Sequence, residues 1–163
     1  MAFPDYLLTQ AAQLLAICRQ KSLMLALAES CSGGLIAALL TEIPGSSDVI
    51  DRGFVTYSNR AKMEMLGVPP LLLETYGAVS REAAIAMAEG GLNHSQAHYC
   101  IAVTGIAGPT GDTPHKPIGT VHLAIASRQM PTIHQACLFQ GDRSLVRLAT
   151  VEKAIGMIAE LVH

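Results

Sequence analysis

Residues 28–34 gather most of the groups in this chain that could do chemistry. They read Ala-Glu-Ser-Cys-Ser-Gly-Gly and supply one carboxylate, two hydroxyls and one thiol. An apolar run precedes them (23–28) and strong helix formers follow (35–40), so we expect a strand, a turn and a helix. The N–H groups at a helix N-terminus stabilise negative charge, and glycine lets a ligand approach the backbone. An ordinary capped turn has the same pattern, so the interpretation depends on residues elsewhere.

Further polar residues follow other predicted strands. A strand at 53–57 ends in Tyr57, and Lys62 comes one helical turn later. A buried strand at 99–104 runs into Thr104 and Gly105, and Arg143 follows the last strand. In open α/β sheets, ligands bind outside the carboxyl ends of the strands. We therefore expect these side chains to converge on one cleft.

The residue types at this predicted cleft favour a serine nucleophile with a lysine base. No histidine follows the strand ends, and Lys62 is the only lysine directly after one of these turns. A free lysine titrates near ~10.4, so Lys62 must be desolvated to act as a base near neutrality. The alternative for Lys62 is a solvated helix lysine. For Arg143 the alternatives are a phosphate clamp and a surface salt bridge. Cys31 is a second candidate nucleophile, because a helix N-terminus lowers a thiol pKa, but a buried structural thiol is equally natural there.

The composition indicates one compact α/β domain spanning residues 1–163. Half of the residues are hydrophobic and 15% are charged, which argues against disorder. A net charge of -2 gives little support to nucleic-acid binding. No apolar run approaches the ~20 residues of a membrane span, and the first residues lack the pattern of a signal peptide. We therefore expect a cytoplasmic protein without nucleic-acid or membrane partners.

Cysteine and histidine spacing predicts neither a metal site nor a cofactor. The four cysteines form no C-x-x-C pair, which disfavours zinc and thioredoxin-type chemistry. His94 and His98 are four residues apart, but no acidic residue lies between them, so the context of a zinc helix is missing.

The elements that must position the cleft alternate along the chain. We expect a mixed, mostly parallel sheet of about five or six strands in a three-layer α/β/α sandwich. Asn59, Ser80 and Asp142 are the predicted N-caps of three helices, and Gly90 and Gly91 mark the end of one. The last two strands suit an antiparallel hairpin at one edge. The remaining predicted helices span residues 4–21, residues from 35 to just before Pro44, and residues from 141–143 to about 162. The remaining predicted strands are 119–126 and 133–139.

Six blocks of sequence, in order, resemble the CinA C-terminal domain family and cover nearly the whole chain. The resemblance implies an α/β/α fold, a homo-oligomer and no metal. It also implies a nicotinamide-nucleotide amidase, which hydrolyses nicotinamide mononucleotide to nicotinate mononucleotide and ammonia. Because 163 residues leave no room for the nucleotide-hydrolase domain of some members, the chain is similar to the stand-alone form. The blocks are residues 28–34, 44–47, 53–62, 77–80, 105–119 and 141–143.

The family's serine–lysine chemistry, carried over by motif, falls on Lys62 with Tyr57 and on a serine. Ser47, in Pro-Gly-Ser-Ser, is the first choice for this nucleophile, and Ser30, in Glu-Ser-Cys, is the second. Ser32 stands where the family often has threonine, which keeps the hydroxyl. Two further departures from the family pattern are Tyr76, where histidine is common, and Asp112, where a second glycine is common. Neither removes a proposed catalytic group.

The resulting hypothesis is acyl transfer at a carboxamide. Lys62 takes the serine proton, and N–H groups at Gly33–Gly34 or Gly105–Ile106 hold the oxyanion. Tyr57 orients the lysine or passes a proton to the leaving ammonia.

The predicted substrate contacts are Ser32, Thr104 and Arg143, with Arg143 and the N–H groups of a glycine-rich turn holding the 5′-phosphate. The alternative function is a non-catalytic, regulatory nucleotide-binding module that uses the same cleft. A purely structural oligomerisation domain fits poorly, because it gives no reason for polar side chains at the strand ends.

Overall fold

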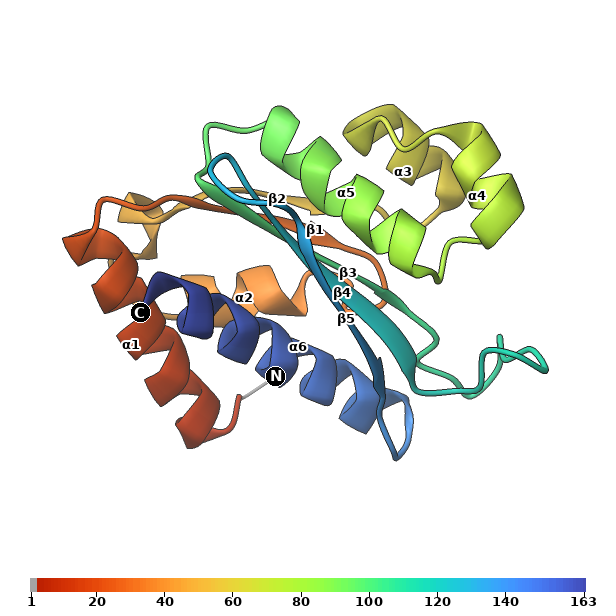
Figure 1. Ribbon diagram of the computed structural model, residues 1–163. Coiled ribbons are helices and arrows are strands. Elements are labelled where there is room, and N and C mark those ends of the chain that lie inside the picture. Colours follow the sequence, from red (N-terminus) through yellow and green to blue (C-terminus); the bar gives the residue numbers. More distant parts are fainter. Residues whose placement is uncertain (1–2) are drawn as a thin grey trace.

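A single sheet between two layers of helices forms the core of the computed structural model, which describes residues 3–163 (Figure 1). The five strands are β1 (Leu25–Glu29), β2 (Ile50–Val55), β3 (Tyr99–Gly105), β4 (Thr120–Ser127) and β5 (Ile133–Leu138). One layer holds α1 (Asp5–Gln20), α2 (Leu35–Thr41) and α6 (Arg143–Val162). The other holds α3 (Asn59–Leu66), α4 (Pro70–Tyr76) and α5 (Arg81–Asn93). The predicted three-layer α/β/α class is confirmed.

The sheet is mixed, in the order β2-β1-β3-β4-β5. β1 pairs with β2 and with β3 in parallel, whereas β3–β4 and β4–β5 are antiparallel. Four strands therefore share one direction and only β4 runs against them, so antiparallel pairings are as frequent as parallel ones. The predicted hairpin at the edge is β4–β5. The carboxyl ends of β1, β2 and β3 meet at one edge of the sheet, where the candidate side chains were expected.

The two faces of the sheet are packed differently. Leucine, isoleucine and valine dominate the core beneath α1, α2 and α6. Alanine dominates the core beneath α5. A Cβ on Gly91 would lie 2.5 Å from Cys100 Sγ, and one on Gly90 would lie 2.0 Å from Leu66 O. These glycines serve close packing, so α5 continues through them to Asn93 and the predicted helix end was wrong.

Helix starts follow the expected capping chemistry with one correction. Ser80 and Asp142 are N-caps whose side chains accept a hydrogen bond from the N–H three residues on, as predicted. Ser58, not Asn59, caps α3. α4 was not predicted, and it begins with proline at its first position, which suits a helix start. No helix within residues 3–163 has both the length and the apolar character needed to cross a membrane.

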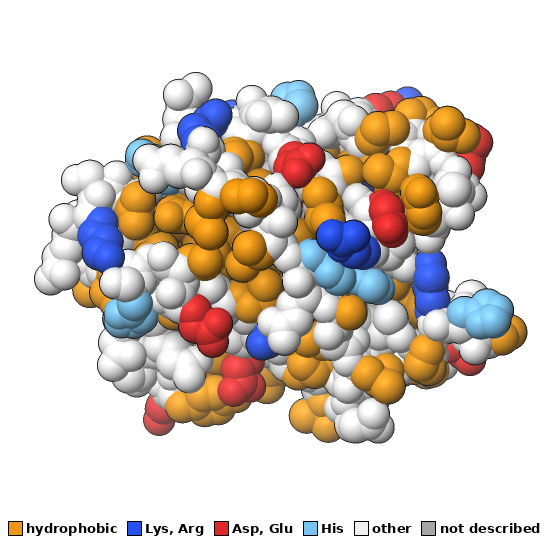
Figure 2. Space-filling model, in the orientation of Figure 1, with side chains coloured by type: hydrophobic (Ala, Val, Ile, Leu, Met, Phe, Trp, Pro, Cys, Tyr) orange, Lys and Arg blue, Asp and Glu red, His pale blue; other side chains and the backbone are white. Residues whose placement is uncertain are grey.

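Charges are dispersed on the face of the molecule shown in Figure 2. Lysine and arginine side chains stand singly there, among acidic and apolar ones. This face therefore offers no continuous basic surface to a polyanion.

Candidate active site

A cavity of about 250 Å³ opens at the edge of the sheet where β1, β2 and β3 end. The loop from β3 to β4 extends from this edge (Figure 1). Six of the residues predicted for the site come together around the cavity, which also has small apolar side chains in its wall. The lining residues are Ser30, Cys31, Tyr57, Asn59, Lys62, Ala78, Val79, Thr104, Gly105, Ala107 and Arg143.

Lys62 and Ser30 form a buried pair. Lys62 Nζ lies 2.9 Å from Ser30 Oγ and 2.8 Å from Thr56 O. Lys62 is 2% exposed and Ser30 is 8% exposed. Among the residues that the structure describes, no carboxylate forms an ion pair with this lysine. Burial lowers the pKa of Lys62, and the nearby Cys31 only partly opposes this shift, so the shift has the direction that a lysine base requires.

Ser47, the first choice of nucleophile from the sequence, lies outside this cavity, whereas Ser30, the second choice, lines it. Ser47 is exposed in a 3₁₀ turn, η1 (Ser46–Asp48), just before β2. Lys62 follows the other end of β2, and the six residues of that strand span roughly 20 Å. The two side chains thus stand at opposite edges of the sheet.

Glu29 occupies the N-terminus of α2, which the sequence had suggested as an anion site. Gly34 N donates to Glu29 Oε2 (3.1 Å), and Gly33 N donates to Ser30 O (3.0 Å). Ser32 Oγ donates to the same Glu29 oxygen at 2.6 Å. The Ser32 hydroxyl and the N–H groups of Gly33 and Gly34, which were predicted to contact the substrate, are thus bonded within the turn, and these three residues do not line the cavity.

Two backbone N–H groups of the same turn stay available. Those of Cys31 and Ser32 donate no hydrogen bond to another residue within residues 3–163. The other predicted oxyanion donor, Ile106 N, is bonded to Thr120 O at 2.9 Å. The amides directly after Ser30 are thus the better candidates for binding an oxyanion.

Arg143 and Tyr57 form the rim of the cavity. The Arg143 guanidinium donates to Tyr57 Oη at 2.7 Å and to Gly108 O at 2.8 Å. Tyr57 is 60% exposed, and its hydroxyl bonds this arginine, so its predicted role in orienting Lys62 is not what the contacts show. A guanidinium has five N–H donors, so Arg143 keeps donors for an anion at the rim.

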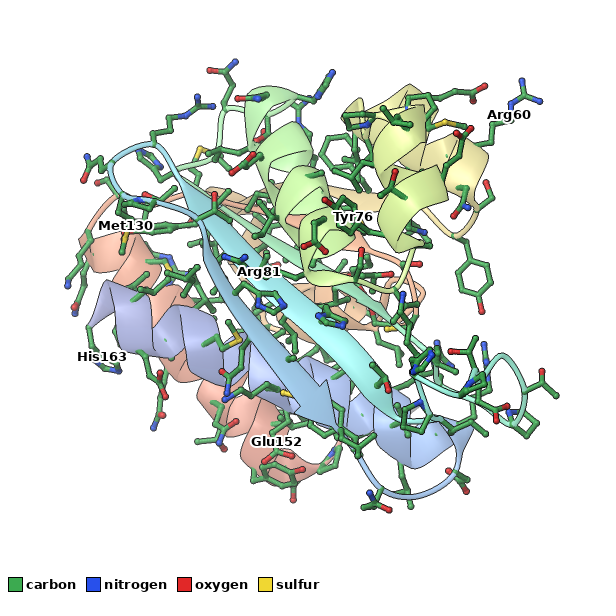
Figure 3. All side chains as sticks on the ribbon, turned by 45° about the vertical axis from the view of Figure 1, so that its right-hand side comes forward. Arg60, Tyr76, Arg81, Met130, Glu152 and His163 are labelled. Carbon is green, nitrogen blue, oxygen red and sulfur yellow. The ribbon has the colours of Figure 1, made fainter. Side chains whose placement is uncertain are left out.

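Thr104 supports the cavity wall. Its hydroxyl donates to Ala78 O at 2.8 Å, and Lys116 Nζ donates to Tyr76 O at 2.8 Å. Figure 3 labels Tyr76 at the end of α4, where the segment to α5 forms this wall. Thr104 is 1% exposed. Because its hydroxyl proton is donated to Ala78 O, only its oxygen can accept a hydrogen bond from a substrate.

The thiol of Cys31 is a poor nucleophile here. Burial raises its pKa to about 12, so the thiolate is scarce near neutrality. Burial outweighs the lowering of this pKa by the neighbouring backbone N–H groups, and the Glu29 carboxylate raises the pKa further.

Sequence reasoning missed two site residues. Asn59 was assigned to a helix cap, yet it lines the cavity. Glu29 was noted only as a carboxylate in the turn, although it holds that turn in place. A carboxylate directly before a turn and helix is a signal for such a cap.

Metal-ligating side chains do not gather in the described part of the chain. No group of three or more histidine, cysteine, aspartate or glutamate residues there has a metal-binding arrangement. His94 and His98 bond backbone groups instead, at Gly90 O and Met24 N respectively.

The chain is similar to proteins and solved structures that carry CinA names. A "CinA-like protein" of Akkermansia muciniphila is 52% identical over 136 residues, which is 83% of this chain and 33% of that protein. A "Putative competence-damage inducible protein" of Symbiobacterium thermophilum is 46% identical over 147 residues, 85% of this chain and 34% of that protein. This chain thus spans about one third of the length of the curated relatives it matches.

The crystal structure of competence/damage inducible protein CihA from Agrobacterium tumefaciens superposes with a TM-score of 0.97 at 47% identity, covering 100% of this chain and 99% of that one. A CinA superfamily protein from Escherichia coli gives a TM-score of 0.91 at 31% identity, covering 99% and 94%. Residues 8–162 match the profile of the CinA C-terminal domain. The chain therefore belongs to the CinA C-terminal domain family.

Proposed function

We propose that this protein is an amidohydrolase that converts nicotinamide mononucleotide and water to nicotinate mononucleotide and ammonia. Ser30 is the nucleophile and Lys62 is its base. The observation that carries this proposal is the buried contact of 2.9 Å between Lys62 Nζ and Ser30 Oγ at the cavity. Family membership supports it, because the family resemblance implies the same reaction.

The first step needs a neutral lysine within hydrogen-bond reach of the serine. A base must lie about 2.6–3.2 Å from the proton-bearing atom, and the observed distance is 2.9 Å. Neutral Lys62 Nζ accepts the Ser30 proton while Ser30 Oγ attacks the carboxamide carbon. Thr56 O, at 2.8 Å from Nζ, holds the amine in place.

The second step needs donors for the oxyanion and a proton for the leaving group. The free N–H groups of Cys31 and Ser32 are suited to the oxyanion, and each such donor contributes about 3 kcal/mol. The Lys62 ammonium returns its proton to the departing nitrogen, so ammonia leaves and an acyl-serine remains. Water then attacks this ester with Lys62 again as base, which releases the carboxylate product.

The cavity has the polarity that such a substrate requires. Small side chains of Ala78, Val79 and Ala107 line it, which suits a flat aromatic ring. The pair of Ser30 and Lys62 is buried, whereas Arg143 stands at the exposed rim. A carboxamide at the buried end and a phosphate at the rim would match both groups.

Ammonia release from nicotinamide mononucleotide by chelator-treated protein tests this function, with Lys62→Ala as the matched variant. We expect release by the wild type and a loss of at least about 100-fold in kcat/KM in Lys62→Ala. Wild-type kcat/KM in that variant would refute the lysine base. No release by the wild type, with a thermal shift on nucleotide binding, would replace the amidase with a regulatory nucleotide-binding module.

The homo-oligomer and the cytoplasmic location stay predictions. Sedimentation velocity measures the first, and fractionation of cells measures the second.

A further inference from the structure

Glu29, the last residue of β1, is an acidic side chain buried to 1% exposure next to Ser30. No cation forms an ion pair with it among the described residues. Its Oε2 accepts hydrogen bonds from Ser32 Oγ at 2.6 Å and from the N–H groups of Gly34 and Ile36, each at 3.1 Å. Its Oε1 accepts from Ala37 N at 2.9 Å. Hydrogen-bond donors of the following turn and helix therefore stabilise this carboxylate.

These contacts fill the N-terminus of α2 completely. The remaining N–H of its first turn, at Leu35, donates to Ser32 O at 3.3 Å. A free helix N-terminus attracts phosphate and other anions. Here the donors are used and a carboxylate is already present, so a second anion meets repulsion.

Glu29 also supports a turn of unusual backbone shape. Gly33 and Gly34 both have positive φ angles, +61° and +94°, and Gly33 N donates to Ser30 O at 3.0 Å. Ser30 N is tied to Val103 O at 3.0 Å. The carboxylate thus holds the far side of a turn whose near side presents Ser30 Oγ to Lys62.

We propose that Glu29 is a positioning residue that fixes Ser30 against Lys62 and sets the direction of the substrate in the cavity. Because Glu29 fills the helix N-terminus beside Ser30, the anionic group of the substrate is left with Arg143 at the rim. Glu29 touches neither the substrate nor the reacting atoms. The inference rests on the proposed amidase function for its substrate and deepens it.

Glu29→Gln tests the positioning role, with Glu42→Gln as the matched control. Glu42 is an exposed residue at the other end of α2. In Glu29→Gln we expect kcat to fall at least about tenfold while KM stays within about twofold, because alignment and not binding is lost. In Glu29→Ala we expect added formate to restore part of kcat. A folded Glu29→Gln variant with wild-type kcat would overturn the proposal.

Labelling of Ser30 by a fluorophosphonate, read by mass spectrometry, separates this proposal from the amidase function. In this reaction the bond between Ser30 Oγ and phosphorus forms, fluoride leaves and Lys62 takes the hydroxyl proton. We expect Glu29→Gln to be labelled at least about tenfold more slowly than the wild type. Slower labelling in a protein that releases no ammonia would keep the positioning role and reject the amidase; equal labelling rates would reject the positioning role.

Binding of inorganic phosphate tests the proposed direction of the substrate in proteins that keep Glu29. This test of the direction therefore remains possible if the Glu29 variants do not fold. We expect phosphate to raise the Tm of the wild type and to leave the Tm of Arg143→Gln unchanged. A shift retained in Arg143→Gln, or no shift in the wild type, would show that the rim is not the anion site.

Discussion

The turn after β1 and the turn before β2 both contain serines and positive-φ glycines, and of these two only the turn after β1 reaches the cavity. The turn after β1 is buried, with Ser30 at 8% exposure, and the Glu29 carboxylate holds it from within. The turn before β2, around Ser47, lies on the surface, where Arg19 bonds Gly45 O and pairs with Asp48. Both residues are serines, but only Ser30 follows the carboxyl end of a strand, as Lys62 does. Position relative to the strand ends, and not residue type, therefore determines which serine can contact Lys62.

Removing each hydroxyl in turn gives the largest expected difference between the two turns. Ser30→Ala should lower kcat/KM for ammonia release at least about 1,000-fold, because the nucleophile is lost. Ser47→Ala should stay within about twofold of the wild type, as surface substitutions far from a site do. The reverse result would make the turn before β2 the active one and would reject Ser30.

Alanine at one glycine of each turn should separate activity from stability. Gly33 (φ +61°) and Gly45 (φ +80°) both have left-handed backbone, and a Cβ on either approaches an arginine side chain, at 3.3 Å and 2.9 Å. Each substitution should cost about 1–2 kcal/mol of unfolding free energy. Only Gly33→Ala should also lower kcat, by roughly tenfold, because it shifts Ser30. Chemical denaturation and initial rates measure both; a similar kcat in the two variants would show that the shape of the first turn is unimportant.

A dependence of stability on pH should come from the lysine beside the first turn. Burial lowers the pKa of Lys62 below its unfolded value of ~10.4, so between the two values the unfolded chain binds more protons. The stability of the wild type relative to Lys62→Met should therefore rise with pH up to ~10.4 and fall as the pH drops through the folded pKa.

Unfolding in urea at several pH values measures this difference. Lys153→Met, which replaces a half-buried lysine of α6, is the control. A difference that is flat with pH would show that Lys62 is charged in the folded protein, and it would weaken the case for Lys62 as a base.

The smallest expected effect concerns the thiol of the first turn. Burial raises the pKa of Cys31 to about 12, so the thiol supplies little thiolate. Cys31→Ala should keep kcat/KM within roughly fivefold of the wild type, because it removes packing and not the nucleophile. A loss as large as that in Ser30→Ala would return Cys31 to the catalytic role.

Much of the fold was predictable from the sequence, because local signals dominate it. Ser80 and Asp142 cap helices as their types suggest, and the apolar run at 99–104 is the central strand β3. α4 escaped prediction because seven residues are too few to show helical periodicity. The end of α5 was misplaced because Gly90 and Gly91 meet neighbours from distant parts of the chain, which no local pattern reveals.

The candidate site was predictable for the residues whose position depends only on the direction of the strands. Lys62, Thr104 and Arg143 reach one cavity because they lie at or after the carboxyl ends of strands that point the same way. The choice between Ser30 and Ser47 depends on which end of β2 each side chain occupies, and motif matching carries no such information. The use of the α2 N-terminus by Glu29 depends on side-chain contacts that a sequence does not specify.

The close packing of α5 against the sheet limits which mutations this protein can accumulate. Beneath α1 and α6, large aliphatic side chains can exchange for one another at modest cost, since volume-conserving changes are tolerated. Beneath α5, Gly90 and Gly91 have no room for a larger side chain, and the only smaller alternative to the alanines is glycine. In a library of single substitutions, the α5 side should be nearly intolerant of change, so natural variation should concentrate on the opposite face of the sheet.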